Sequence, residues 1–295
     1  MSIKQKTTVD KTPEKIQELF GQIAPRYDFL NNFFSVGIAR IWRRQTVRQV
    51  LQRLAKREQP LSRPILDVAT GTGDILIEFQ RQLKKTNAIR FELPSPEQFC
   101  FPVIGSLPSS PPHSEPEPLD NSRYHSFMEY RNNPLIGVDF TPEMLEIARK
   151  KAPGIFFMQA DGTHLPFGDN SCSAVTISFG LRNMQHTELG LAEMVRVCQP
   201  GGVVAILEFT MPTFPILSTI YRFYFQKMMP RIGQKIAKNT HNAYNYLPES
   251  VSEFDDREKI VQRLKNHHLT EISAIPLTVG IATLYLARVP ENKSE

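Results

Sequence analysis

Cysteine is scarce in this 295-residue chain, which has only Cys100, Cys172 and Cys198. Their odd number argues against a disulfide framework, and their wide spacing resembles no structural metal site. We therefore expect a protein of a reducing compartment without a metal centre. Hydrophobic residues make up 41% of the chain, which is enough for a sizeable core.

Long apolar runs are also missing. No segment approaches the roughly 20 apolar residues that cross a bilayer, and the polar start MSIKQKTTVDK lacks the apolar core of a secretory signal. These absences predict a cytoplasmic protein, or one bound peripherally at the cytoplasmic face of a membrane.

Acidic residues are few in two regions. Residues 1–60 carry twelve Lys or Arg against five Asp or Glu, so the net charge of +5 is concentrated there. The second region, 209–248, has no acidic residue and contains Arg222, Lys227, Arg231, Lys235 and Lys238. Such zones fit an anionic membrane surface or a nucleic acid, although a solvated basic face is the commoner case.

The run PILDVATGTG, residues 64–73, lacks two features of the common nucleotide loops. A dinucleotide fingerprint needs a third glycine where this chain has Leu76, and a phosphate loop needs a lysine after Gly73, where Asp74 stands. An acidic residue there would repel a pyrophosphate but accept a hydrogen bond from an amino group. Because Gly71 and Gly73 allow a ligand to approach the main chain, the turn predicts a site for S-adenosylmethionine.

Alternating strand and helix patterns predict an α/β fold with a doubly wound, mostly parallel sheet. Helices are expected after Thr12 and Pro13 and over 38–54, 74–85, 142–151, 188–198 and 255–266. Strands are expected over 65–68, 134–140, 155–161, 174–179, 202–209, 270–276 and 281–289, the last two as an antiparallel pair. Residues 1–60 read as an N-terminal helical cap and 61–295 as the main domain. Within it, the proline-rich stretch at about 91–133 is an irregular insertion.

Candidate ligand contacts follow the predicted strands. Asp139 ends the second strand, where a carboxylate accepts hydrogen bonds from a ribose diol. Its distance of 66 residues from Gly73 exceeds the usual spacing of about 20, and the insertion explains the excess. A helix-capping aspartate is the alternative. Asp161 and Gly162 end the third strand, where an adenine ring is expected, and Ser178 ends the fourth.

The sequence after Ser178, FGLRN, lacks the Asn/Asp-Pro-Pro-aromatic pattern of base-methylating enzymes. This absence argues against a nucleic-acid acceptor. Arg182 and Asn183 are instead candidates for contacts with oxygen atoms of a small acceptor, or for satisfying loop backbone groups.

Longer motifs resemble the S-adenosylmethionine-dependent C-methyltransferases of ubiquinone and menaquinone biosynthesis. They are IAPRYDFLNNFFSVGIARIWRR, LDVATGTGD, GVDFTPEMLEIARKK, ADGTHLPFGDNSCSAVTISFGLRNM, VCQPGGVVAILEF and PRIGQKIAKNTHNAYNYLPESV. The resemblance implies a seven-stranded class I methyltransferase fold with N-terminal helices and a helical lid at about 211–250. It implies cofactor contacts at Thr72, Asp139, Asp161, Gly162 and Ser178, to which the turn adds Asp67, Gly71 and Gly73.

Two positions differ from the pattern of this family. Ala39 stands where a histidine is usual, which puts any role of that histidine in doubt. Leu30 stands where methionine is common, and it resembles the plant and cyanobacterial branch that makes phylloquinone. The expected reaction is therefore methylation of demethylphylloquinol, or of demethylmenaquinol. Alternatives are a benzoquinol of ubiquinone, plastoquinone or tocopherol synthesis, a sterol, or a binding protein without activity.

Methylation of an electron-rich quinol requires loss of a phenolic proton and no metal ion. Asp28, Tyr246 and His241 are candidates for the base, and Tyr27 for a hydrogen bond to the quinol; structural hydrogen bonding is the alternative for each. The apolar segment 216–229, within the acid-free region, predicts a lid that collects a prenylated quinol at an anionic membrane surface. Core packing of a cap helix is the alternative there.

Overall fold

A computed structural model of the chain describes residues 10–29, 35, 37–56, 61–85, 133–212 and 243–291. The predicted insertion, apart from Asn133, lies outside the described residues. So do His241 and most of the predicted lid, of which 211, 212 and 243–250 are described. No helix in the described part of the chain is long and apolar enough to span a membrane.

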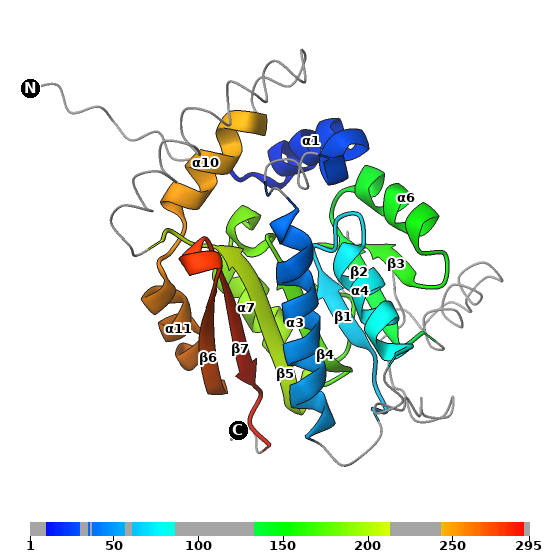
Figure 1. The fold of residues 1–295 in the computed structure, drawn as a ribbon, viewed down its shortest axis with the longest axis vertical. Helices are drawn as coiled ribbons and strands as arrows, with labels where there is room; N and C mark the ends of the chain where they lie inside the picture. The colour runs from blue at the N-terminus through cyan, green and yellow to red at the C-terminus, as the bar shows by residue number, and fades with distance from the viewer. Residues whose placement is uncertain are drawn as a thin grey trace, which may run out of the picture.

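A seven-stranded sheet with the order β3-β2-β1-β4-β5-β7-β6 forms the centre of the fold (Figure 1). Its strands are β1 (Ile65–Val68), β2 (Leu135–Asp139), β3 (Phe156–Gln159), β4 (Cys172–Ser178), β5 (Cys198–Phe209), β6 (Thr270–Leu277) and β7 (Ala282–Arg288). The first five pair in parallel, whereas β7 runs antiparallel to both β5 and β6. The predicted doubly wound, mostly parallel sheet and its antiparallel edge are confirmed.

Helices cover both faces of this sheet, because its central strands are buried on both sides. One face packs against α3 (Ile38–Ala55), α4 (Asp74–Leu83) and α6 (Pro142–Lys151), and the other against α7 (Thr187–Val197) and α11 (Arg257–Asn266). Trp42, Val47 and Val50 of α3 are buried in the same core as β5 and β7. The segment predicted as a cap thus supplies a helix of the main core.

Two further helices lie above the carboxyl ends of the parallel strands, α1 (Pro13–Ile23) and α10 (Ala243–Glu253) (Figure 1). Short 3-10 turns follow α1 at Ala24–Arg26, β4 at Leu181–Asn183 and β6 at Thr278–Gly280. Thr12 and Thr141 occupy the positions before α1 and α6 as predicted, but neither side chain caps its helix. Instead, the backbone N–H of Thr141 donates to Asp139, which turns this residue toward the strand end.

Candidate active site

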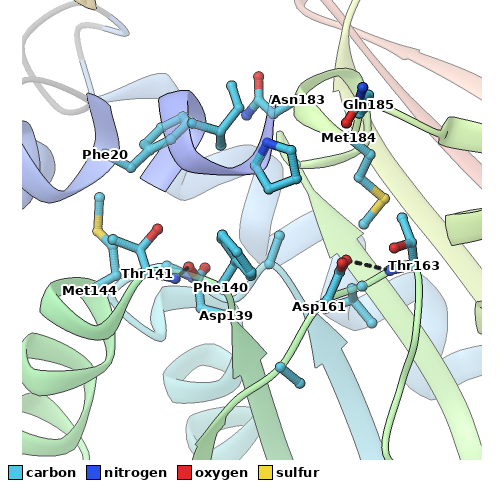
Figure 2. A pocket seen from close by; sticks show the side chains of 18 of the residues that line it. Phe20, Asp139, Phe140, Thr141, Met144, Asp161, Thr163, Asn183, Met184 and Gln185 are labelled. Atoms are coloured by element: carbon cyan, nitrogen blue, oxygen red, sulfur yellow. Dashed lines mark hydrogen bonds between the residues drawn. The ribbon is translucent and has the colours of Figure 1, made fainter. Parts of the chain in front are cut away.

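A pocket that is partly open to solvent lies between the strand ends and α1 (Figure 2). We call the strand-end side the floor; it comprises Val68, Ala69, Gly71, Asp139, Phe140, Ala160, Asp161, Gly162, Ser178, Phe179 and Gly180. The opposite side, the roof, comprises Lys11, Pro13, Ile16, Phe20 and Tyr27. Side walls come from residues that include Met144, Asn183 and Met184.

The glycine turn after β1 has the backbone that its sequence predicts. Gly71 and Gly73 have φ values of +57° and +82°, which few other residues adopt. Gly71 lines the pocket, whereas Gly73 does not. A Cβ on Gly73 would lie 2.9 Å from the Phe157 ring, so this glycine serves close packing below the turn rather than a ligand.

Asp139 joins the ends of β1 and β2 at the pocket. Its Oδ2 accepts a hydrogen bond of 2.7 Å from the N–H of Gly71, and its Oδ1 one of 2.8 Å from Thr141. Burial raises the pKa of this carboxyl, and these N–H groups oppose the shift. Each carboxylate oxygen keeps a further lone pair, so Asp139 both fixes the turn and presents acceptors to the pocket.

Two strand ends in the floor hold strained backbone. Ala69, after β1, and Phe179, after β4, have φ values of +51° and +58° although neither is glycine. Such conformations gather at functional sites, where the surrounding structure maintains them. A Cβ on Gly180 would lie 2.6 Å from that of Ala69, so the two turns meet. Beside them, the buried hydroxyl of Ser178 has no hydrogen-bond partner in the described structure.

Asp161 and Gly162 line the floor beyond β3, as predicted. Asp161 Oδ1 accepts a hydrogen bond of 2.8 Å from the N–H of Thr163, drawn dashed in Figure 2. A Cβ on Gly162 would come within 2.5 Å of Met184 Cε. The absence of a side chain there lets Met184 close one wall of the pocket.

Asp67 lies below the pocket and does not line it. It is 2% exposed, and its Oδ1 accepts a hydrogen bond of 2.6 Å from the Thr176 hydroxyl on the neighbouring strand. Burial raises the pKa of its carboxyl to about 7. Asp67 therefore supports the turn from beneath.

Arg182 does not line the pocket, although its neighbour Asn183 does. Its Nη1 lies 2.7 Å from Glu208 Oε1 and 2.6 Å from the carbonyl of Phe179, and both charged side chains are at least 95% buried. The guanidinium is also 5.3 Å from the centre of the Phe209 ring. Arg182 thus holds η3 (Leu181–Asn183) to the end of β5, which leaves Asn183 facing the pocket.

Tyr246 of α10 acts on the same turn. Its hydroxyl donates a hydrogen bond of 2.9 Å to Asn183 Oδ1, and burial raises its pKa to about 12. A phenol that is a hydrogen-bond donor with a raised pKa is a poor base at neutral pH. Tyr246 does not line the pocket, and its ring contacts the edge of Phe20 at 6.4 Å between centroids.

Asp28 and Thr72 form an ionic cluster outside the pocket lining. Thr72 Oγ1 donates to Asp28 Oδ1 at 2.6 Å, and Lys151 Nζ lies 2.7 Å from Asp28 Oδ2. The same ammonium is 2.6 Å from Asp74 and 3.1 Å from Thr72. The structure therefore places Asp28 as a tie between the segment after α1 and the glycine turn. Tyr27, its neighbour, lines the roof.

Sequence reasoning missed Lys11 and Phe20 as pocket residues. Both lie at or beside α1, whose apolar spacing predicts a helix but not where that helix packs. A lysine before an amphipathic helix carries no signal of its own. Lys11 lines the pocket because α1, which it precedes, lies above the carboxyl ends of the strands (Figure 1).

Comparison with known proteins adds to this geometry. The sequence profile of the ubiE/COQ5 methyltransferase family matches residues 7–288. A ubiquinone/menaquinone biosynthesis C-methyltransferase of Geobacter sp. strain M21 is 35% identical and covers 92% of this chain and 95% of its own length. A demethylmenaquinone methyltransferase of Deinococcus radiodurans is 34% identical, covering 92% of each. The solved SAM-dependent methyltransferase of Thermotoga maritima is 14% identical with a TM-score of 0.53, covering 94% of this chain and 100% of its own, which confirms the class I fold.

Proposed function

The chain belongs to the ubiE/COQ5 methyltransferase family, and on that premise we propose that its acceptor is a prenylated naphthoquinol. The protein is an S-adenosylmethionine-dependent C-methyltransferase of quinone biosynthesis. The acceptor we favour is demethylphylloquinol or demethylmenaquinol, with a benzoquinol as the alternative. The preference for demethylphylloquinol over demethylmenaquinol rests on Leu30, which lies outside the described residues.

One observation carries this proposal: a single pocket brings polar residues at the strand ends together with apolar and aromatic side chains of the roof. The floor contributes Asp139, Asp161 and Ser178, whereas Ile16, Phe20 and Tyr27 face it from the roof. A flat aromatic ring can lie against this roof while the methyl donor lies along the strand ends. Binding both molecules in one pocket favours their alignment.

The floor fits S-adenosylmethionine, which supplies a methyl group on a positively charged sulfur. Asp139 has free lone pairs for the ribose hydroxyls, and Gly71 leaves the turn open to the ligand. The unpartnered hydroxyl of Ser178 can form a hydrogen bond that the protein does not provide. We assign Asp161 and Gly162 to the adenine. Thr72, Gly73 and Asp67 support the turn without lining the pocket.

On the acceptor side, we assign Tyr27 and Asn183 to quinol contacts. We also propose that the acid-free region between β5 and α10 meets an anionic membrane, where a prenylated quinol is dissolved. His241, Arg222 and Lys227 belong to this region and lie outside the described residues.

Methyl transfer from labelled S-adenosylmethionine tests the acceptor directly. The purified chain is incubated anaerobically with short-chain demethylnaphthoquinol or with the matching demethylbenzoquinol. We expect transfer of label to the naphthoquinol at least tenfold faster than to the benzoquinol. Equal rates, or faster transfer to the benzoquinol, would refute the naphthoquinol assignment, and no transfer to either would refute a quinol acceptor.

A further inference from the structure

We propose that Lys11 and Asn183 together bind the negatively charged oxygen of the quinol acceptor. This inference rests on the proposed function and deepens it, because it names the groups that recognise the ionised substrate. Both residues line the pocket, Lys11 from the roof and Asn183, the last residue of η3, from a side wall. The ligand class is an aryl oxygen anion.

The hydrogen bonds of Asn183 leave one donor for a ligand. The carbonyl of Phe179 can only accept, so Nδ2 donates to it at 3.2 Å. This orientation turns Oδ1 toward the Tyr246 hydroxyl, which donates at 2.9 Å. An amide nitrogen carries two hydrogens, and the second has no partner among the described residues. Tyr246 thus fixes the amide so that its free group is a donor.

Lys11 is the one lysine or arginine among the described residues that line this pocket. Its side chain is half-buried, and it forms no hydrogen bond or ion pair within the described structure. Partial removal of an ammonium from water is costly, and an anionic ligand would offset that cost.

The charges around Lys11 place it on the Asn183 side of the pocket. Burial lowers the pKa of its ammonium, and the positive charge of Arg182 in η3 lowers it further. Three carboxylates oppose this shift: Glu253 of α10, Glu208 of β5 and Asp255. Arg182 immediately precedes Asn183, but Glu208 holds its guanidinium away from the pocket. Lys11 therefore supplies the positive charge that the neighbouring arginine does not.

The reaction needs such a positive charge beside the acceptor oxygen. The phenolic proton leaves to solvent, and the oxygen becomes an anion whose electrons enrich the ring. The ring carbon then takes the methyl group, leaving the S–C electron pair on sulfur, and loses its own proton as the ring becomes aromatic again. A cation and an N–H placed at the oxygen stabilise the anion from which the ring carbon attacks.

Substitution of Lys11 by methionine tests this assignment, because methionine keeps the length of the side chain without its charge. We expect kcat with demethylnaphthoquinol to fall about 10- to 100-fold, and the acid limb of its pH profile to move upward. The dissociation constant for S-adenosylmethionine should stay within about twofold. Lys11→Arg should restore most of the activity. The matched control is Lys15→Met, since Lys15 lies exposed one turn along α1 and pairs with Glu18 at 3.1 Å.

A binding measurement separates this inference from the proposed function. In the presence of S-adenosylhomocysteine, which cannot donate a methyl group, wild type should bind the quinol more tightly as the pH rises from about 6 to 9, where the quinol ionises. Lys11→Met should lose most of this gain. Identical binding curves for the two proteins, or an equal loss of S-adenosylmethionine affinity, would overturn the assignment of Lys11. If wild type binds and methylates no quinol, the proposed function fails with it.

Discussion

The floor and the roof of the pocket are held in place by different kinds of interaction. The floor consists of strand ends joined by buried backbone hydrogen bonds, among them the 2.9 Å bond from Thr70 N to the carbonyl of Val138. The roof rests on side chains, such as Gln17, which donates to the carbonyl of Phe140 at 3.3 Å, and Phe20, which contacts Tyr246. Backbone hydrogen bonds therefore hold the floor, whereas single side chains position the roof.

Breaking the buried ion pair between Arg182 and Glu208 should have the largest effect on stability. Glu208→Ala leaves the Arg182 guanidinium buried without its charged partner, so the free energy of unfolding should fall by about 3–5 kcal/mol. Urea denaturation measures this loss. Glu188→Ala is the control, because Glu188 pairs with Arg263 at 2.6 Å on the surface, where its side chain is 55% exposed. That variant should lose less than about 1 kcal/mol of stability. Equal losses in the two variants would show that the buried pair stabilises the fold no more than the surface pair.

Asp139→Ala should weaken binding of S-adenosylmethionine by about 10- to 100-fold, because hydrogen bonds to a charged group contribute roughly 1.5–3 kcal/mol. Calorimetry measures the affinity, with Asp169→Ala as a control, since Asp169 is exposed and pairs with Arg196. A 2′-deoxy analogue of S-adenosylhomocysteine distinguishes ribose binding from support of the turn. Wild type should discriminate against this analogue, and the variant should not. Unchanged affinity in Asp139→Ala would contradict the ribose assignment.

Asp67 links the stability of the floor to pH. The folded carboxyl keeps its proton up to a pKa of about 7, against an ordinary pKa of 3.8 in the unfolded chain. Between these values the folded state binds more protons, so the free energy of unfolding falls as the pH rises. Relative to wild type, Asp67→Asn should gain about 2 kcal/mol between about pH 5 and pH 8. Urea denaturation at both pH values tests this, and a constant difference between the two proteins would contradict it.

The floor could be predicted from the sequence because local patterns encode it. The glycine turn, Asp139, Asp161, Gly162 and Ser178 each follow a strand, and parallel strands bring their carboxyl ends to one edge. Tyr27 and Asn183, which the sequence predicts as quinol contacts, also line the pocket.

The remaining assignments depended on contacts between distant residues. Arg182 resembles an acceptor contact until Glu208, 26 residues later, is seen to hold it away. Asp28 resembles a base until Lys151 is found beside it. Lys11 carries no local signal, because its role depends on where α1 packs.

Loss of the Lys151 ion pairs with Asp28 and Asp74 should have the smallest effect on stability, and that effect should be local to the roof. Lys151 Nζ bridges Asp28 and Asp74 at 2.7 and 2.6 Å, and Asp74 also lies 3.0 Å from Arg43 Nη2. These side chains are partly exposed, so Lys151→Met should cost less than about 1 kcal/mol of global stability. Hydrogen exchange should nevertheless quicken about two- to fivefold at residues 24–29.

The glycine turn is the internal reference for this experiment, because its backbone bonds do not involve Lys151. Exchange at residues 70–73 should stay unchanged, and Lys150→Met, at the exposed neighbouring position, should alter neither segment. Equal acceleration at the turn and at residues 24–29 would mean that floor and roof open together. Faster exchange at residues 24–29 alone would mean that the acceptor side can open while the donor site stays formed, so that a quinol can enter over a bound methyl donor.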